Sequence, residues 1–274
     1  MWFDRSGVEL GSVGAPGDYG DVSLSPDGTQ AAVSVRAPGS EAADIWVIDA
    51  VSGLGTSLTS DPANDIAPVW SADGRRVVFA SLRGGSYDIY ERAGDETGTD
   101  TTIVVATGDQ IPSDWSSDGR YLIYQTDEPD VVAGGNLDLW ARPLPAGRPF
   151  AFLRTVRAVS HATFSPDGSR VAFVSSEGGR EDVYVAAFPR YDGRRRVSVA
   201  GGAWPRWNRD GGEVFYLDPE NQLMAASVGQ AATDLGVATP RALFRLRARL
   251  DRGYPYDVSA DGQRVLVSVV GRVD

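Results

Sequence analysis

The sequence predicts an all-β fold, a six-bladed β-propeller of four-stranded blades that fills the whole chain. A short apolar run ending in an Asp-Gly turn occurs six times, and successive turns lie 46, 45, 49, 43 and 51 residues apart in a chain of 274 residues. Four strand-like segments fit into each interval, and a period in the forties with four strands is typical of a propeller blade. The six turn aspartates are Asp27, Asp73, Asp118, Asp167, Asp210 and Asp261.

The fourth repeat shows the plan of one blade most clearly. Residues 162–165 form the expected inner strand, and Pro166-Asp167-Gly168 forms a tight turn in which Asp caps its own backbone and Gly supplies a positive φ. The expected second, third and outer strands are 170–175, 182–187 and 195–199. On this plan the single expected domain, 1–274, divides into blades at 15–60, 61–107, 108–157, 158–200, 201–250 and 251–274 plus 1–14.

Two segments have high helix propensity, 221–235 and 241–250. The repeat places Leu223–Ala226 where the fourth blade has Tyr184–Ala187, and residues 244–250 alternate with period two. Both segments are therefore expected to contain strands.

The two ends of the chain complement each other. The sixth Asp-Gly unit supplies only two strands, whereas residues 2–10 resemble a third and a fourth strand with no preceding pair. We expect the N-terminal segment to complete the last blade and close the ring, which removes open sheet edges.

Composition excludes many kinds of chemistry. There are 26 Lys+Arg, all of them Arg, against 37 Asp+Glu, so the net charge is −11; there is no Cys, and His161 is the only histidine. These counts exclude lysine Schiff bases, thiol nucleophiles, disulfides and histidine-rich metal clusters. The acidic balance argues against nucleic-acid binding. What remains is carboxylate, hydroxyl or arginine chemistry, or binding without catalysis.

Most of the carboxylates and aromatic residues that recur are expected to be structural. An acidic or aromatic residue at the same place in several blades is better explained by turns, hydrogen bonds and the blade core than by several copies of a site. The arginine-rich stretches 190–196 and 241–252 are expected to keep outer edges soluble. Besides the turn aspartates, the recurring set is Asp44, Asp88, Asp138, Asp182, Trp70, Trp115, Phe164 and Trp207.

The candidate site lies where the repeats differ. Residues four and six positions before each turn aspartate should line the central channel and its mouth. Two interpretations are open: a water-filled channel whose charges satisfy each other, or a site for a small ligand, an ion or a peptide, in which Arg206 grips a carboxylate or phosphate and Trp204 offers a stacking face. The candidate ligand-binding residues are Asp21, Asp114, His161, Trp204, Arg206 and Asp257. No catalytic residue, metal ligand or cofactor is assigned.

The repeat resembles the TolB-type, WD-like six-bladed propellers: an aromatic residue, Ser-Pro-Asp-Gly, a β-run, a Gly turn, then an acidic residue, an aliphatic residue and Tyr or Trp. The fifth repeat departs from it, with Asn208-Arg209 before its turn and no Asp ahead of Leu223. The opening Trp2-Phe-Asp-Arg-Ser-Gly, with Gly17-Asp18-Tyr19, resembles the start of the C-terminal propeller of bacterial membrane-anchored Ser/Thr kinases.

The resemblance implies a non-catalytic, monomeric sensor or interaction module, cut from a larger signalling protein, that binds a protein, a peptide or a small ligand. It would be extracytoplasmic if the kinase resemblance holds and otherwise cytoplasmic, with no membrane contact of its own. One alternative is a periplasmic TolB-like scaffold. A second, a metal-dependent propeller hydrolase or lactonase, would have to use Asp21, Asp114 and Asp257, the only acidic members of the set.

Overall fold

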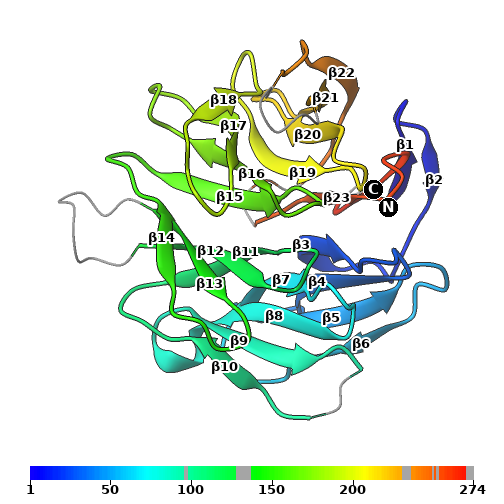
Figure 1. Cartoon of the computed structure of the whole chain (residues 1–274). Helices are drawn as coiled ribbons and strands as arrows, with labels where there is room; N and C mark the ends of the chain where they lie inside the picture. Colours follow the sequence, from blue (N-terminus) through cyan, green and yellow to red (C-terminus); the bar gives the residue numbers. More distant parts are fainter. Residues whose placement is uncertain (96–97, 128–136, 230–235, 249, 251–252, 270–274) are drawn as a thin grey trace. The chain divides into compact units, whose positions relative to one another are not determined.

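A computed structural model of the chain describes residues 1–95, 98–127, 137–229, 236–248, 250 and 253–269. The chain forms six four-stranded sheets (Figure 1), which confirms the six-bladed propeller with four-stranded blades. Contacts group the chain into two compact units: one comprises Met1–Pro112 and Leu246–Asp274, the other Ser113–Arg245. No helix of the described part is long and apolar enough to cross a membrane.

The first three blades follow one another along the chain. Their strands are β3 (Asp18–Leu24), β4 (Gln30–Arg36), β5 (Ala43–Asp49) and β6 (Gly55–Ser57); β7 (Asp65–Trp70), β8 (Arg76–Ser81), β9 (Asp88–Ala93) and β10 (Thr101–Val104); and β11 (Gln110–Trp115), β12 (Tyr121–Thr126), β13 (Asp138–Pro143) and β14 (Phe150–Leu153). A short 3₁₀ turn, η1 (Leu82–Gly84), follows β8, and nothing in the sequence pattern predicts it.

The remaining blades continue this order. Their strands are β15 (Val159–Phe164), β16 (Arg170–Ser175), β17 (Asp182–Ala187) and β18 (Arg194–Arg196); β19 (Ala203–Trp207), β20 (Glu213–Leu217), β21 (Gln222–Ser227) and β22 (Arg241–Arg245); and β23 (Tyr256–Val258) and β24 (Arg264–Val267) with β1 (Trp2–Asp4) and β2 (Glu9–Gly11). The two segments of high helix propensity thus contain β21 and β22; residues 230–235 in the first and residue 249 in the second lie outside the described residues. The register corrects the expected alignment by one residue, because Met224, opposite Tyr216, takes the place that Tyr184, opposite Phe173, has in the fourth blade.

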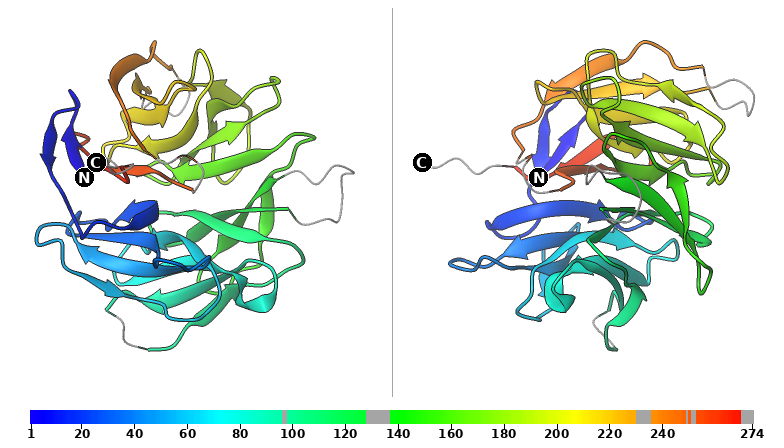
Figure 2. Two further views of the ribbon diagram at one scale, coloured as in Figure 1. Left: turned by 180° about the vertical axis from the view of Figure 1, so that it is seen from behind. Right: turned by 90° about the vertical axis from the view of Figure 1, so that its left-hand side faces the viewer.

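The last blade is completed by the N-terminus, as the sequence predicts. β1 pairs antiparallel with β24, with Trp2 opposite Leu266 and Asp4 opposite Arg264, and β2 forms the outer strand. Both views of Figure 2 show these blue strands beside the red β24. Trp2 is only 8% exposed and packs with Val22, Ile48 and Leu266.

The repeated turn is held by its own side chains. In the first blade Ser25 Oγ donates to Asp27 Oδ1 at 2.7 Å, and the Thr29 amide donates to the same oxygen at 3.0 Å. Gly28 has a φ of 71°, which glycine adopts without a Cβ penalty. The same serine-to-aspartate bond occurs at Asp73, Asp118, Asp167 and Asp261. These five turn aspartates are therefore structural, as predicted, and Asp210 of the fifth blade accepts the Gly212 amide at 2.7 Å.

The aspartates that begin the third strands also have structural partners. Asp182, 2% exposed, accepts a hydrogen bond from Ser198 Oγ at 2.7 Å, and Asp138 accepts one from Arg154 Nε at 3.0 Å. Thr59 Oγ1 lies 3.4 Å from Asp44 Oδ1. These bonds tie the third strand of a blade to the segment that carries its outer strand.

Candidate functional site

Among the inner strands whose pairing is described, four shift register at a bulge that the sequence does not predict, and in three of them the bulge contains a left-handed residue. Ala67, His161 and Trp204 have φ values of 54°, 51° and 52°, and the strand register shifts around each of them. A left-handed conformation costs a non-glycine residue about 1 kcal/mol. Bulges re-aim side chains and are common beside functional sites. Proline occupies the same repeat position in two blades, at residues 112 and 255, so residue type gives no signal of the bulge.

The six candidate residues are divided between the two compact units, and the two groups are described separately. Asp21 and Asp257 belong to the first unit; Asp114, His161, Trp204 and Arg206 belong to the second. The fold class is that of a propeller, but the expectation that all six side chains converge on one opening stays a prediction.

Asp21 is a buried hydrogen-bond centre of the first unit. It is 5% exposed, and its carboxylate accepts the Ala67 amide at 3.0 Å and the Tyr254 amide at 2.9 Å, together with the Ser34 hydroxyl at 3.1 Å. Burial raises the pKa of the Asp21 carboxyl, and these hydrogen bonds act in the opposite direction. Asp21 thus joins the first blade to the second blade and to the segment that precedes β23.

Asp114 and Asp257 make the same pair of hydrogen bonds in different blades. Asp114 accepts the amide of its neighbour Trp115 at 2.8 Å and, with its other oxygen, the amide of Phe164 in the next blade at 2.7 Å. Asp257 accepts the amide of Val258 at 2.8 Å and that of Leu24 in the first blade at 2.8 Å. Each carboxylate therefore links its own inner strand to that of the following blade.

Indole groups make a second link of this kind. Trp70 Nε1 donates to the carbonyl of Ser23 in the preceding blade at 3.1 Å, and Trp207 Nε1 donates to the carbonyl of Thr163 at 3.2 Å. The repeat aromatic at this position is thus part of the joint between blades. These polar groups of the inner strands therefore hold neighbouring blades together.

His161, Trp204 and Arg206 form a separate group, the inner-strand cluster, in the second unit. The His161 and Trp204 rings meet edge to face with centroids 5.7 Å apart. Ser160 Oγ lies 2.9 Å from His161 Nδ1, and the His161 amide points to Gln125 Oε1 at 3.4 Å. All three side chains of the cluster are half-buried. Both rings are carried by bulge residues, so the bulges are what brings them together.

Charge in the inner-strand cluster is positive at neutral pH. Burial, followed by the nearby Arg206 guanidinium, lowers the pKa of His161 to about 4. His161 is therefore neutral at pH 7, and Arg206 supplies the charge. An arginine beside an aromatic ring suits a carboxylate or phosphate group that is itself attached to an apolar or planar body.

The lowered pKa predicts an acid-sensitive contribution to stability. Between pH 6.5 and about 4 the unfolded chain binds a proton at His161 that the folded chain does not, so stability falls as the pH falls through this window. The upper limit of the loss is about 3 kcal/mol. His161→Gln removes the titration; urea unfolding at pH 7 and pH 4.5 should show a smaller acid loss in the variant than in the wild type. Parallel pH profiles would contradict the assignment.

Comparison with known proteins supports the TolB-type propeller. The family model described as TolB beta propeller domain matches residues 9–139. An uncharacterized protein of Agrobacterium fabrum (strain C58) is 24% identical over 216 residues, which cover 72% of this chain and 69% of that protein.

Among the described residues there is no group of three or more His, Cys, Asp or Glu that could hold a metal ion.

Solved structures agree on the fold. A putative TolB from Agrobacterium tumefaciens aligns with a TM-score of 0.75 at 17% identity, covering 98% of this chain and 97% of that one. TolB from Acinetobacter baumannii aligns with a TM-score of 0.72 at 18% identity over 90% of this chain; the chain spans 59% of that protein's length. Propellers of lyases and peptidases also align, at TM-scores of 0.62. At these identities the likeness shows the fold and leaves the activity open.

Proposed function

We propose that this chain is a non-catalytic, TolB-like scaffold or binding module, and that the inner-strand cluster contacts a carboxylate of a protein or peptide partner. The observation that carries the proposal is that the candidate residues fall into two groups with different surroundings. Asp21, Asp114 and Asp257 have their oxygens engaged by backbone amides of neighbouring segments. Arg206, whose guanidinium lowers the pKa of His161, adds a positive charge to the half-buried His161–Trp204 ring pair.

The engaged carboxylates also argue against acid-base or metal catalysis at these positions. A catalytic carboxylate must exchange a proton or coordinate a ligand, and each of these three would first have to release a neighbouring blade. A turnover of lactones, phosphate esters or peptides with added Ca²⁺, Mn²⁺ or Zn²⁺ that Asp114→Ala or Asp257→Ala abolished in folded protein would contradict the proposal.

The resemblance of residues 2–7 and 17–19 to kinase-attached propellers extends the proposal without changing the site. In that case the same surface would act as the sensor of a signalling protein. An upstream kinase domain and membrane span in the full-length gene would support the sensor role, whereas a signal peptide alone would favour the periplasmic scaffold.

Binding by variants tests the proposal. Arg206→Ala and Trp204→Ala should leave the thermal midpoint within a few degrees of the wild type and weaken binding of a partner recovered by pull-down at least tenfold. Truncating one member of a buried, hydrogen-bonded charge pair costs about 2–5 kcal/mol, which applies to Arg206, and Trp204→Ala removes a stacking face. Arg245→Ala is the matched control, since Arg245 lies on the outer strand β22 and pairs with the exposed Glu220. Unchanged binding by the cluster variants, with loss in Arg245→Ala, would move the binding surface to the outer strand.

A further inference from the structure

One aromatic position on the third strand is covered by an arginine in three blades. The position is occupied by Trp46, Tyr90, Trp140 and Tyr184, each two residues after the third-strand aspartate. Arg83 lies over Tyr90 at 4.4 Å from the ring centroid, Arg194 over Tyr184 at 4.4 Å, and Arg154 over Trp140 at 5.8 Å. Such contacts are favourable because a guanidinium is attracted to the face of an aromatic ring.

Each of these arginines is also bonded to a carboxylate of its own blade. Arg154 bonds Asp138 at 3.0 Å, Arg83 bonds Asp100 at 2.5 Å, and Arg194 pairs with Glu177. The third blade shows the arrangement in its simplest form, because Asp138 and Trp140, two residues apart on one face of β13, bind the same guanidinium. In the third blade an aspartate and an aromatic residue at this spacing thus form an arginine site, whereas in the second and fourth blades the arginine over the ring pairs with another carboxylate.

The first blade has the same aspartate and aromatic residue without the arginine. No described arginine lies over Trp46, and Asp44 forms no ion pair with a described residue. The register shows the difference from the fourth blade: Tyr184 is opposite Arg196 and Ala186 opposite Arg194, whereas Trp46 is opposite Ser57 and Ile48 opposite Gly55. Gly55 therefore stands where the fourth blade has Arg194. A Cβ built on Gly55 would lie 3.6 Å from Trp46 Cε3.

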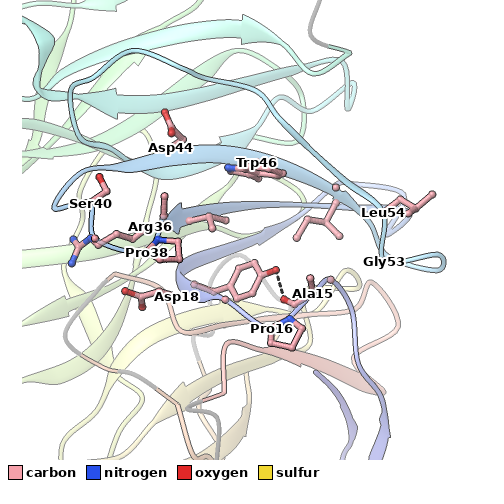
Figure 3. Close-up of a pocket in the computed structure, with 18 residues that line it drawn as sticks. Ala15, Pro16, Asp18, Arg36, Pro38, Ser40, Asp44, Trp46, Gly53 and Leu54 are labelled. Atoms are coloured by element: carbon pink, nitrogen blue, oxygen red, sulfur yellow. Dashed lines mark hydrogen bonds between the residues drawn. The ribbon is translucent and has the colours of Figure 1, made fainter.

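The uncovered ring faces a cavity of about 640 Å³ in the first unit, here called the Trp46 groove. Its walls include Asp18, Asp44, Trp46, Pro16, Pro38 and Leu54. Figure 3 shows Trp46 on β5 across the groove from Pro16. Volumes of about 300–1,000 Å³ are usual for ligand pockets, and the Asp44 carboxylate with an open indole ring suits a cation.

Burial raises the pKa of the Asp44 carboxyl, with the nearby Asp61 acting in the same direction. A cation placed beside Asp44 would relieve both effects, because it favours the charged carboxylate. The chain as a whole carries a net charge of −11, which attracts a basic partner. Arg36 also lines the groove and forms no ion pair with a described residue, so it is available for a carbonyl or carboxylate of the same ligand.

We propose that the Trp46 groove binds an arginine side chain of an extended peptide segment from a partner protein, with the guanidinium over Trp46 and bonded to Asp44 as Arg154 is to Trp140 and Asp138. This site is distinct from the inner-strand cluster in the second unit and from the function proposed for it. The two sites call for opposite charges in their ligands.

The probe is an acetylated, amidated pentapeptide Ala-Pro-Arg-Pro-Ala, in which proline keeps the chain extended. Its control replaces arginine with citrulline, which has the same shape and no charge, and calorimetry measures both. The arginine peptide should bind at least tenfold more tightly than the citrulline peptide. Arg206→Ala should leave this binding unchanged, which separates the groove from the inner-strand cluster.

Three variants localise the binding. Trp46→Met should abolish it while the protein stays folded, because the fifth blade has Met224 at this position. Trp46→Tyr should retain it, since Tyr90 and Tyr184 hold an arginine. Gly55→Arg should block it by filling the groove from within; its Cβ would lie 3.1 Å from Ile48 Cγ1, a contact that a flexible side chain can relax.

Four results would overturn the proposal. They are equal binding of the arginine and citrulline peptides, arginine binding that survives both Trp46→Met and Gly55→Arg, no binding of the arginine peptide at millimolar concentration, or a preference for a glutamate peptide. The last result would assign the groove to Arg36 and an anion instead. If free argininamide bound as tightly as the peptide, the occupant of the groove would be a small cation and not a peptide.

Discussion

Removal of residues 1–13 is expected to yield a chain that unfolds or aggregates. The deletion takes away β1 and β2, exposes the edge of β24, and uncovers the apolar residues that Trp2 packs against, Val22, Ile48 and Leu266. Loss of a buried tryptophan alone costs about 3–5 kcal/mol, a large part of the about 5–15 kcal/mol by which a domain is stable. An exposed edge strand also promotes association between chains.

The thermal midpoint and the elution volume of the truncated chain measure the effect. Val8→Ala provides the control, because Val8 lies in the same segment and is 57% exposed, so its replacement should change neither quantity. A truncated chain that remains monomeric with an unchanged midpoint would contradict closure of the last blade by the N-terminus.

Asp21→Ala is expected to lower the free energy of unfolding by about 3–5 kcal/mol. The substitution leaves the buried amides of Ala67 and Tyr254 and the Ser34 hydroxyl without their acceptor. Asp21→Asn should be intermediate, because one oxygen remains but an amide group then faces a backbone donor. Chemical denaturation of the three proteins measures the differences.

The matched control is Asp192→Ala. Asp192 is exposed, and its replacement should change the free energy of unfolding by less than about 0.5 kcal/mol. If Asp21→Ala were as stable as this control, the hydrogen bonds of Asp21 would not hold the blades together, and Asp21 would return to the list of residues available for ligand binding.

The repeat made most of the fold predictable. Each blade reuses one turn, so six copies of Asp-Gly and the spacing between them locate the strands, and the bounds 170–175 and 182–187 expected for the fourth blade are those of β16 and β17. The expected inner and outer strands, 162–165 and 195–199, are instead Val159–Phe164 and Arg194–Arg196. Segments with high helix propensity form strands instead, because pairing with their neighbours in the blade outweighs a weak local preference.

The roles of the candidate residues could not be predicted from the repeat. Sequence spacing identifies Asp114 and Asp257 as unlike their counterparts in other blades, but the amides that they accept, at Phe164 and Leu24, come from other repeats. The close approach of Asp21 to Gly253, where a Cβ would lie 1.7 Å from Oδ1, is likewise a contact between distant segments. The only local sign was that these positions break the repeat.

The Trp46 groove could not be predicted from the repeat, because what distinguishes the first blade is a missing arginine. Trp46 follows the repeat, and the difference lies in Gly55, whose position is equivalent to that of Arg194 in the fourth blade only when the two outer strands are aligned by register. A comparison of outer strands by register, rather than by distance from the turn, would have found it.

The carboxylates among the six candidate residues hold blades together, and we propose that the inner-strand cluster binds a partner. The most direct test measures both the free energy of unfolding and partner affinity for Asp114→Ala, Asp257→Ala, Trp204→Ala and Arg206→Ala. The two aspartate variants should lose about 1–3 kcal/mol of stability and keep their affinity. The other two variants should keep their stability and lose affinity at least tenfold. Aspartate variants of unchanged stability that no longer bind, beside cluster variants that still bind, would contradict this assignment.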